Sequence, residues 1–115
     1  MRNDKDNLIV NLTFKFALAI IDYCEQLESN RKFILSNQLL KSGTSIGANA
    51  REAQNAESKA DFIHKFKVAA KEADETEYWL LLCKESKSYP NPDALLNDLE
   101  VIIKVISKII GSSKT

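Results

Sequence analysis

The segment between Phe62 and Cys83 constrains the fold of this chain more than any other. Its inward-facing candidates recur in unbroken steps of four and three residues: Phe62, Phe66, Ala69, Ala73, Thr76, Leu80 and Cys83. Residues three and four positions apart share one face of an α-helix, so this spacing is typical of a helix with one buried face. Ser58 and Asp61 resemble a capping box at its start, with Asp in place of the usual Glu. The pattern predicts a helix over residues 59–86.

Three further segments carry the same periodicity. It predicts a helix over 8–28, with Asp6 or Asn7 as its cap and an end at Ser29-Asn30. It predicts another over 92–110, started by Asn91-Pro92 and stopped by Gly111. The predicted inward residues are Leu8, Leu12, Phe16, Ala19, Tyr23 and Leu27 in the first helix, Leu35, Leu39, Gly43, Ile46, Ala50 and Ala53 in the second, and Leu95, Leu99, Ile102, Ile106 and Ile109 in the last.

The remaining helix, predicted over 32–54, passes through a segment that resembles a loop. Residues 42–47 contain Gly43 and Gly47, and each glycine costs roughly 1 kcal/mol relative to alanine in a helix. The apolar stripe nevertheless keeps its phase there, and small residues in phase with a core permit close helix packing. We therefore expect helix throughout.

Turn-forming residues are too scarce for an all-β fold. The chain has three glycines and two prolines in 115 residues, whereas a sandwich or barrel needs a turn every 8 to 12 residues. Four helices of similar length with short connections favour an all-α, up-down-up-down antiparallel four-helix bundle, with residues 1–115 forming a single domain.

The short second connection predicts how the middle helices align. Residue pairs whose numbers sum to roughly 113 are expected at one level. Gly43 should then meet Ala70 or Ala73, and Gly47 should meet Phe66, which would make these two helices the closest pair.

Charge and cysteine content indicate a cytoplasmic protein. Sixteen basic and 16 acidic residues cancel, which removes a global positive field. Cys24 and Cys83 lie inside helical patterns without metal-ligand spacing and are expected to be free thiols. Asp4, Asp6 and Lys15 argue against a signal peptide, and no apolar run approaches the length of a membrane span.

Neither a metal site nor catalytic chemistry is favoured. His64 follows Asp61 by three residues, but a di-metal carboxylate bundle needs a second histidine, so a solvated side chain is expected. The acidic residues Glu72, Asp74, Glu75 and Glu77 permit an acid–base reading, although a solvated helix face is favoured. Glu77 flanks the core stripe and is expected to meet a partner from another helix or subunit. No nucleophile motif or phosphate loop occurs, so we expect no enzyme, no metal and no cofactor.

Nucleic-acid binding would depend on a group of basic residues around the second and third helices. The candidates are Lys41, Arg51, Lys59, Lys65, Lys67 and Lys71. Their acidic neighbours weaken the expected field, and Phe62 and Phe66 are in phase with the core rather than placed to stack on bases. RNA or DNA remains an alternative partner.

The last helix carries an unusually wide apolar arc. Leu96 and Ile103 on one flank, and Val101 and Val105 on the other, widen the stripe to roughly 220°. The first helix adds an outer set, which is Ile9, Phe14, Leu18 and Ile21. Burial between two flanking helices of one chain would account for the arc, but a subunit interface formed by Leu96, Val101, Ile103 and Val105 is preferred.

Three runs resemble the 23S rRNA intervening-sequence protein family over nearly the whole chain. They are residues 45–53 (SIGANAREA), residues 58–62 (SKADF), and residues 71–80 with Lys-Glu-Ala followed by Glu-Thr-Glu-Tyr-Trp-Leu. Many members have Ile where this chain has Ala50 and Gly where it has Ala53. The resemblance implies a small bacterial four-helix bundle whose activity is generally undefined, some members being encoded within segments inserted into ribosomal RNA genes.

The resemblance also implies roles and partners. The matching residues Asn49, Glu52, Glu77 and Trp79 are assigned to packing and interhelical hydrogen bonds. A related protein, the accessory variability protein of diversity-generating retroelements, is a pentamer that binds a reverse transcriptase and nucleic acid through a basic surface, whereas this chain is neutral. We therefore expect a homopentamer that acts as an assembly or adaptor module. The alternative is an RNA-binding accessory protein linked to ribosomal RNA or a reverse transcriptase.

Overall fold

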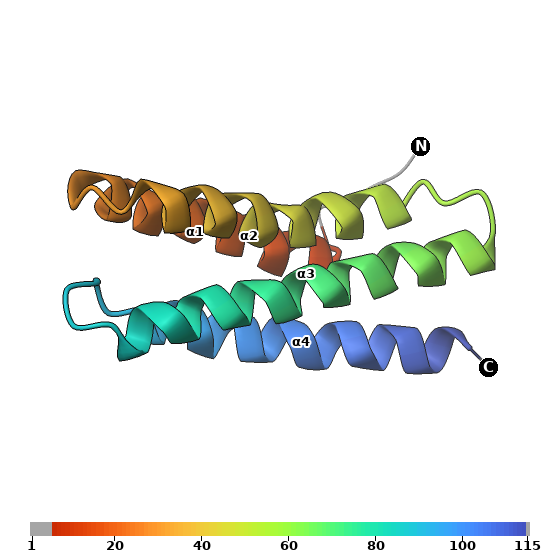
Figure 1. Ribbon diagram of the computed structural model, residues 1–115. Coiled ribbons are helices and arrows are strands. Elements are labelled where there is room, and N and C mark those ends of the chain that lie inside the picture. Colours follow the sequence, from red (N-terminus) through yellow and green to blue (C-terminus); the bar gives the residue numbers. More distant parts are fainter. Residues whose placement is uncertain (1–5, 115) are drawn as a thin grey trace.

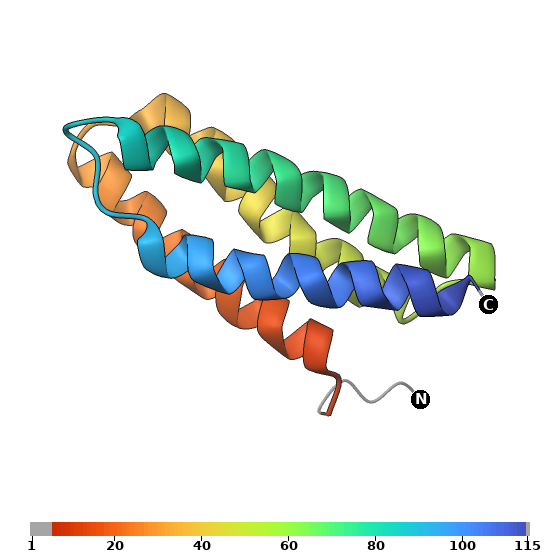
Figure 2. The ribbon, with the colours of Figure 1, turned by 90° about the horizontal axis from the view of Figure 1, so that it is seen from below.

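The computed structural model describes residues 6–114, which form four α-helices. They are α1 (Leu8–Ser29), α2 (Phe33–Ala53), α3 (Lys59–Glu85) and α4 (Asp93–Ser113). Successive helices run in opposite directions along a body of 46 × 25 × 21 Å, and α4 also packs against α1 (Figures 1 and 2). The prediction of an all-α antiparallel four-helix fold is confirmed. In the part of the chain described here, none of the helices combines the length and apolarity needed to cross a bilayer.

Local capping residues fix where α1 and α3 begin. The Asn7 side chain accepts a hydrogen bond from the Val10 N–H at 3.3 Å, and the Ser58 hydroxyl accepts one from the Asp61 N–H at 3.0 Å. Both satisfy backbone donors that a first helical turn leaves unpaired. The Asp61 carboxylate accepts from the Glu57 N–H at 3.1 Å, one residue earlier than a standard capping box requires.

The first connection is short and adopts an unusual backbone conformation. Asn30 caps the end of α1, as predicted, and its backbone N–H points back to carbonyls of the last turn. Arg31 has φ 62°, a left-handed conformation that is uncommon outside glycine. The structure thus reverses the chain at a residue that sequence reasoning did not single out.

The ends of α4 differ from the prediction. The helix begins at Asp93, and the Asn91 side chain still accepts from the Asp93 N–H at 2.9 Å. It then continues through Gly111 to Ser113. A glycine weakens a helix by roughly 1 kcal/mol, but it ends one only where the chain turns away, and nothing after Gly111 imposes a turn. The polar tail predicted for 112–115 is therefore helical through Ser113, and Thr115 lies outside the described residues, as does Asp4.

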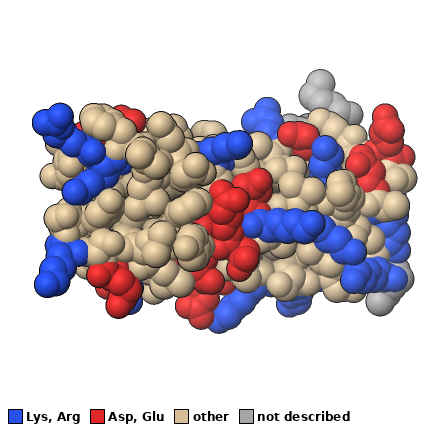
Figure 3. Space-filling view, viewed as in Figure 1, with Lys and Arg blue, Asp and Glu red and all other residues tan. Residues whose placement is uncertain are grey.

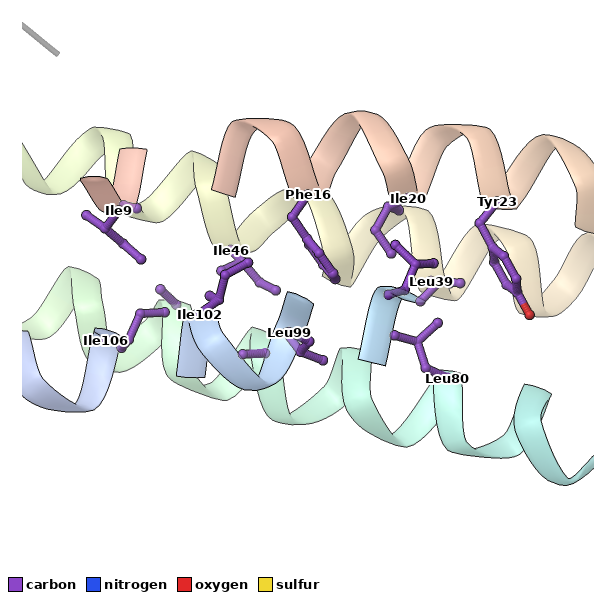
Figure 4. Close-up of a cluster of buried hydrophobic side chains, with 14 of the residues drawn as sticks. Ile9, Phe16, Ile20, Tyr23, Leu39, Ile46, Leu80, Leu99, Ile102 and Ile106 are labelled. Carbon is purple, nitrogen blue, oxygen red and sulfur yellow. The ribbon is translucent and has the colours of Figure 1, made fainter. Parts of the chain in front are cut away.

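The core fills the space between the four helices along the whole length of the bundle. Its fully buried apolar residues come from every helix (Figure 4): Ile20 and Leu27 from α1, Leu39 and Ile46 from α2, Phe66 and Leu80 from α3, and Leu99, Ile102 and Ile106 from α4. The predicted stripes of α2, α3 and α4 supply most of these residues. Their periodicity therefore identified the buried faces.

The buried face of α1 differs from the prediction in the first turns of the helix. Leu8 was predicted to face inward but is 61% exposed, whereas Ile9, predicted on the outer face, is 4% exposed. Thr13 continues the buried line because its hydroxyl donates to the Ile9 carbonyl at 2.7 Å, which removes the penalty for burying it. Over the rest of the helix the predicted residues Phe16, Tyr23 and Leu27 are buried, as expected.

The two glycines of α2 approach α1 and not α3. A Cβ at Gly43 would lie 2.9 Å from Ile20, and one at Gly47 would lie 3.2 Å from Thr13. The predicted meetings with Ala70 or Ala73 and with Phe66 were therefore wrong. The helical repeat predicts that a residue is buried, but it does not predict which of the neighbouring helices that residue contacts.

The alignment of α2 with α3 is shifted by about one helical turn from the prediction. The hydroxyls of Ser42 and Thr76 lie 2.9 Å apart, and Glu52 meets Lys65 at 3.1 Å. The first turn of α3 extends beyond the end of α2, as Figure 1 shows. A short connection fixes the direction of the next helix more tightly than its level.

Candidate interaction surface

The outer sides of α1 and α2 form an apolar surface, which we call the α1–α2 face. Six of its residues line a hollow between the two helices: Val10, Phe14 and Ala17 of α1, and Thr44, Gly47 and Ala48 of α2. The exposed residues Leu18, Ile21 and Leu40 lie four positions from Phe14, Ala17 and Thr44 and extend it along the helices. Phe14 is 60% exposed and Leu18 is 50% exposed. Spacings of three and four place the residues of each helix on one side, opposite or beside its buried stripe.

A hollow of about 210 Å³ lies in this face between the two helices. Small side chains open it: Gly47 and Ala48 on α2, and Ala17 on α1, while the Phe14 ring forms one wall. Arg51, at the end of α2, is the one charged residue among those that line it. Such a concave apolar site with a single charge at its edge fits an apolar side chain of a protein partner.

The flanks of α4 are mostly covered within the chain. Leu96, Ile103 and Val105 are half-buried and pack against the core, while Val101 remains 50% exposed. Because α4 packs against both α1 and α3, burial within one chain accounts for most of the width of its apolar arc. This burial is the alternative that the sequence left open. A subunit interface at these four residues stays a prediction, and Val101 has the exposure that it requires.

Further exposed apolar residues lie near the opposite end of the bundle, where sequence reasoning did not look. They are Phe33 and Ile34 at the start of α2, and Tyr78, Leu81 and Leu82 near the end of α3. Ile34 is the most exposed of them at 83%. Their helical phase, opposite to or beside the buried stripe, was the available signal.

The six candidate basic residues do not form one patch. Lys65 is bonded to Glu52, and this hydrogen bond together with the Glu52 charge raises the pKa of the lysine. Lys41 lies near enough to Glu72 for its charge to lower the pKa of that carboxyl, against the larger effect of burial. Arg51 lines the α1–α2 face instead. The exposed residues Lys59, Lys67 and Lys71 lie along α3. Figure 3 shows acidic side chains between the basic ones across this side of the molecule.

The acidic residues of α3 have separate surroundings. Burial, together with the Glu75 charge, raises the pKa of Glu72, while Asp74 and Glu75 are exposed. Glu77 is half-buried at a hollow of about 250 Å³ between α3 and α4, beside Asp74 and Ile103. Within residues 6–114 no hydrogen bond or ion pair reaches Glu77, so the expected partner from another helix is not found. A partner from another subunit stays a prediction.

The residues matched to the family pattern bond mainly within their own helices. The Asn49 side chain donates to the Ser45 carbonyl at 2.9 Å, and the Trp79 ring N–H donates to the Glu75 carboxylate at 3.1 Å. Glu52 does join two helices, through Lys65. The expected packing is found for Trp79, which lies against the core, whereas these hydrogen bonds of Asn49 and Trp79 each stay within one helix.

Buried hydroxyl groups make the interhelical contacts instead. Thr76 lies 2.9 Å from the Ser42 hydroxyl and also donates to the Glu72 carbonyl at 2.7 Å. Between α1 and α2, the Ser36 hydroxyl donates to the Cys24 carbonyl, and the Cys24 thiol contacts the Ser36 carbonyl at 3.5 Å. The position of Ser42 next to Gly43 in the stripe was the signal that sequence reasoning missed.

Potential chemical groups are dispersed or buried. Cys24 and Cys83 are free and buried, and burial raises the pKa of both thiols. His64 is exposed. No group of three or more potential metal ligands occurs among residues 6–114.

Comparisons with known proteins agree with the fold. The sequence profile of a family described as 23S rRNA-intervening sequence protein matches residues 5–112. The chain is also similar to a protein of unknown function from the S23 ribosomal protein family of Bacteroides thetaiotaomicron. That crystal structure has a TM-score of 0.84 and 42% sequence identity, over 89% of this chain and 97% of the other. No curated protein matches. A relation to the accessory variability protein stays a prediction from resemblance.

Proposed function

The chain belongs to the 23S rRNA intervening-sequence protein family, and we propose that it is a non-enzymatic protein that associates with copies of itself and serves as an assembly or adaptor module. The observation that carries this proposal is the α1–α2 face. Phe14, Leu18 and Ile21 stay exposed on one side of α1 although the chain has a complete core elsewhere. A contiguous apolar surface of this kind is typical of a protein contact.

Covering the face contributes favourably to association. Burying the exposed parts of Phe14 and Leu18 contributes about 1 kcal/mol or more for each side chain. The hollow beside Phe14 offers a central pocket that a partner side chain can fill. Central, well-packed apolar contacts of this type carry most of the binding energy in protein interfaces.

We place the assembly in a closed ring. Where a contact joins two different surfaces of identical chains, it either closes by rotation or propagates as a filament. The number five comes from the family resemblance alone. Val101, half-exposed on α4, adds a candidate contact at another side of the bundle.

Sedimentation velocity on the wild type and two variants tests the proposal. The wild type at micromolar concentration should sediment as an oligomer, and Phe14→Asp/Leu18→Asp should dissociate it because carboxylates in an apolar contact lose hydration without gaining partners. Ile34→Asp is the control, since Ile34 is 83% exposed and lies outside the face. Circular dichroism must show that each variant remains helical.

The outcomes separate two claims. A monomeric wild type would refute the assembly. An oligomer that survives the double substitution, or that dissociates equally in the Ile34→Asp control, would refute the role of the α1–α2 face.

A further inference from the structure

The connection between α3 and α4 is tied down across the end of the bundle. The Tyr23 hydroxyl, from α1, donates to the Pro90 carbonyl at 2.6 Å. The Lys32 ammonium group, from the turn between α1 and α2, lies 4.9 Å from the centre of the Tyr89 ring. Lys84 and Asp93, at the two ends of the connection, form an ion pair at 3.3 Å. The first two contacts join the connection to α1 and to the turn before α2, and the ion pair joins α3 to α4 beneath it. Tyr89 also packs against the core, and Pro92 is buried.

Cys83 lies at the base of this connection. It is 1% exposed, and its thiol lies close to the Tyr23 hydroxyl that donates to the Pro90 carbonyl. An open hollow of about 460 Å³ runs alongside, lined by Cys83, Tyr89 and Pro92 among others. Only a small displacement of the connection therefore separates the thiol from solvent.

Cys24 is held differently, although its exposure is similar at 3%. It lies between α1 and α2, where the Ser36 hydroxyl donates to its backbone carbonyl and its thiol contacts the Ser36 carbonyl. Reaching it requires the last turns of α1 to separate from the first turn of α2, which are both helical and packed on the core. Static burial does not distinguish the two thiols, but the structural unit that must open for each one does.

We propose that residues 86–92 form a strap that opens as a local unit, with the rest of the bundle intact, and that its opening exposes Cys83 and not Cys24. The Tyr23 hydroxyl is the latch, because it is hydrogen-bonded to the strap at Pro90 and lies beside the Cys83 thiol. While the strap is closed the Cys83 thiol is unreactive, since desolvation disfavours the thiolate. The strap thus controls access to a nucleophilic group at one end of the molecule.

Thiol labelling of the intact wild-type chain tests the strap. The protein is treated with N-ethylmaleimide at increasing urea concentrations below the unfolding transition, and the label on each cysteine is quantified by peptide mass spectrometry. Cys83 should react faster than Cys24, at a rate that hardly depends on urea, because local opening exposes little surface. Cys24 should react at a rate that rises with urea as global unfolding does.

Substitutions identify the latch. Tyr23→Phe should accelerate labelling of Cys83 about tenfold, as expected when the closed state loses a hydrogen bond of ordinary strength. Lys32→Ala should accelerate it a few-fold without touching either thiol. Tyr78→Phe is the matched control, because Tyr78 is 57% exposed and is not among the residues that line the hollow beside Cys83, and it should change neither rate.

The result that would overturn the proposal is specific. It fails if both cysteines of the wild type react at the same rate with the same urea dependence, or if Cys24 reacts first. It also fails if Tyr23→Phe accelerates both thiols equally, since the hydroxyl would then stabilise the whole bundle and not the strap.

Discussion

Gly43 and Gly111 both lie inside helices, yet their surroundings are opposite. An added Cβ at Gly43 would come within 2.9 Å of two atoms of Ile20, which is itself fully buried, whereas one at Gly111 would meet nothing within 4 Å. The first glycine is required by the approach of α1 to α2. The second carries only the entropic cost that glycine imposes on a helix.

Alanine substitutions at these two positions should therefore have opposite effects on stability. Gly43→Ala should lower the free energy of unfolding by about 1–3 kcal/mol, because the strain of overpacking exceeds the gain in helix propensity. Gly111→Ala should raise it by up to about 1 kcal/mol. Urea denaturation followed by circular dichroism measures both. A Gly43→Ala variant as stable as the wild type would mean that the two helices separate easily at this point.

The hydroxyl groups in the core show that the polarity of a residue alone does not predict whether it is buried. Thr13 and Thr76 are almost fully buried because each donates to a carbonyl one turn earlier in its own helix. Sequence reasoning included Thr76 in the stripe because its phase was unbroken, and omitted Thr13 because Leu12 offered an apolar choice beside it. Where position in the helical repeat and side-chain polarity disagreed, position in the repeat was the better predictor of burial.

At the scale of the helices, α1 and α4 show what periodicity can and cannot predict. Both carry apolar residues beyond a narrow stripe, and both were expected to contribute to an interface. In the structure Ile103 and Val105 on α4 pack against the core, whereas Phe14 and Leu18 on α1 remain exposed. A sequence pattern gives the width of an apolar arc, but the number of neighbouring helices decides how much of that arc one chain covers.

Helix ends were predictable where a side chain satisfies a specific backbone donor. Asn7 and Ser58 cap α1 and α3 as expected, because short polar side chains at these places accept the unpaired N–H groups. The level of α2 against α3 was not predictable, since the overhang of α3 depends on how the residues between the two helices fold. Sequence therefore predicted the architecture, and contacts between helices determined where the candidate surface lies.

Aspartate substitutions on the two flanks of α4 should separate core from surface. Ile103→Asp should lower the free energy of unfolding by about 2–4 kcal/mol, because a carboxylate would replace a side chain packed on the core, next to Asp74 and Glu77. Val101→Asp should cost less than about 1 kcal/mol, since Val101 is 50% exposed. Thermal unfolding under conditions that keep the protein monomeric is the measurement. Equal losses would show that both flanks belong to the core.

At the scale of the whole molecule, the arrangement of charge matters more than its sum. The net charge is zero at neutral pH, and the described ion pairs lie on the surface, including those of Lys65 with Glu52 and of Lys104 with Glu100. Figure 3 shows the two signs interspersed on the side formed by α2 and α3. Exposed ion pairs contribute little to stability, so their main effect is to neutralise the field that a polyanion would encounter.

Binding of RNA should therefore be weak and should not depend steeply on salt. A protein that neutralises several phosphates of a single strand loses affinity with a log–log slope of about −0.7 for each phosphate. Here Lys65 is bonded to Glu52, Lys41 faces Glu72, and Arg51 lies on the α1–α2 face, so few cations are positioned to act together. Fluorescence anisotropy with a generic single-stranded RNA, titrated at several salt concentrations, should give a shallow slope that Lys67→Glu/Lys71→Glu hardly changes. Tight binding with a slope steeper than about −3, abolished by that double substitution, would contradict this expectation and favour a nucleic-acid-binding role over the adaptor role. The physical explanation would then be that an assembled ring aligns lysines of neighbouring subunits, which a single subunit does not bring together.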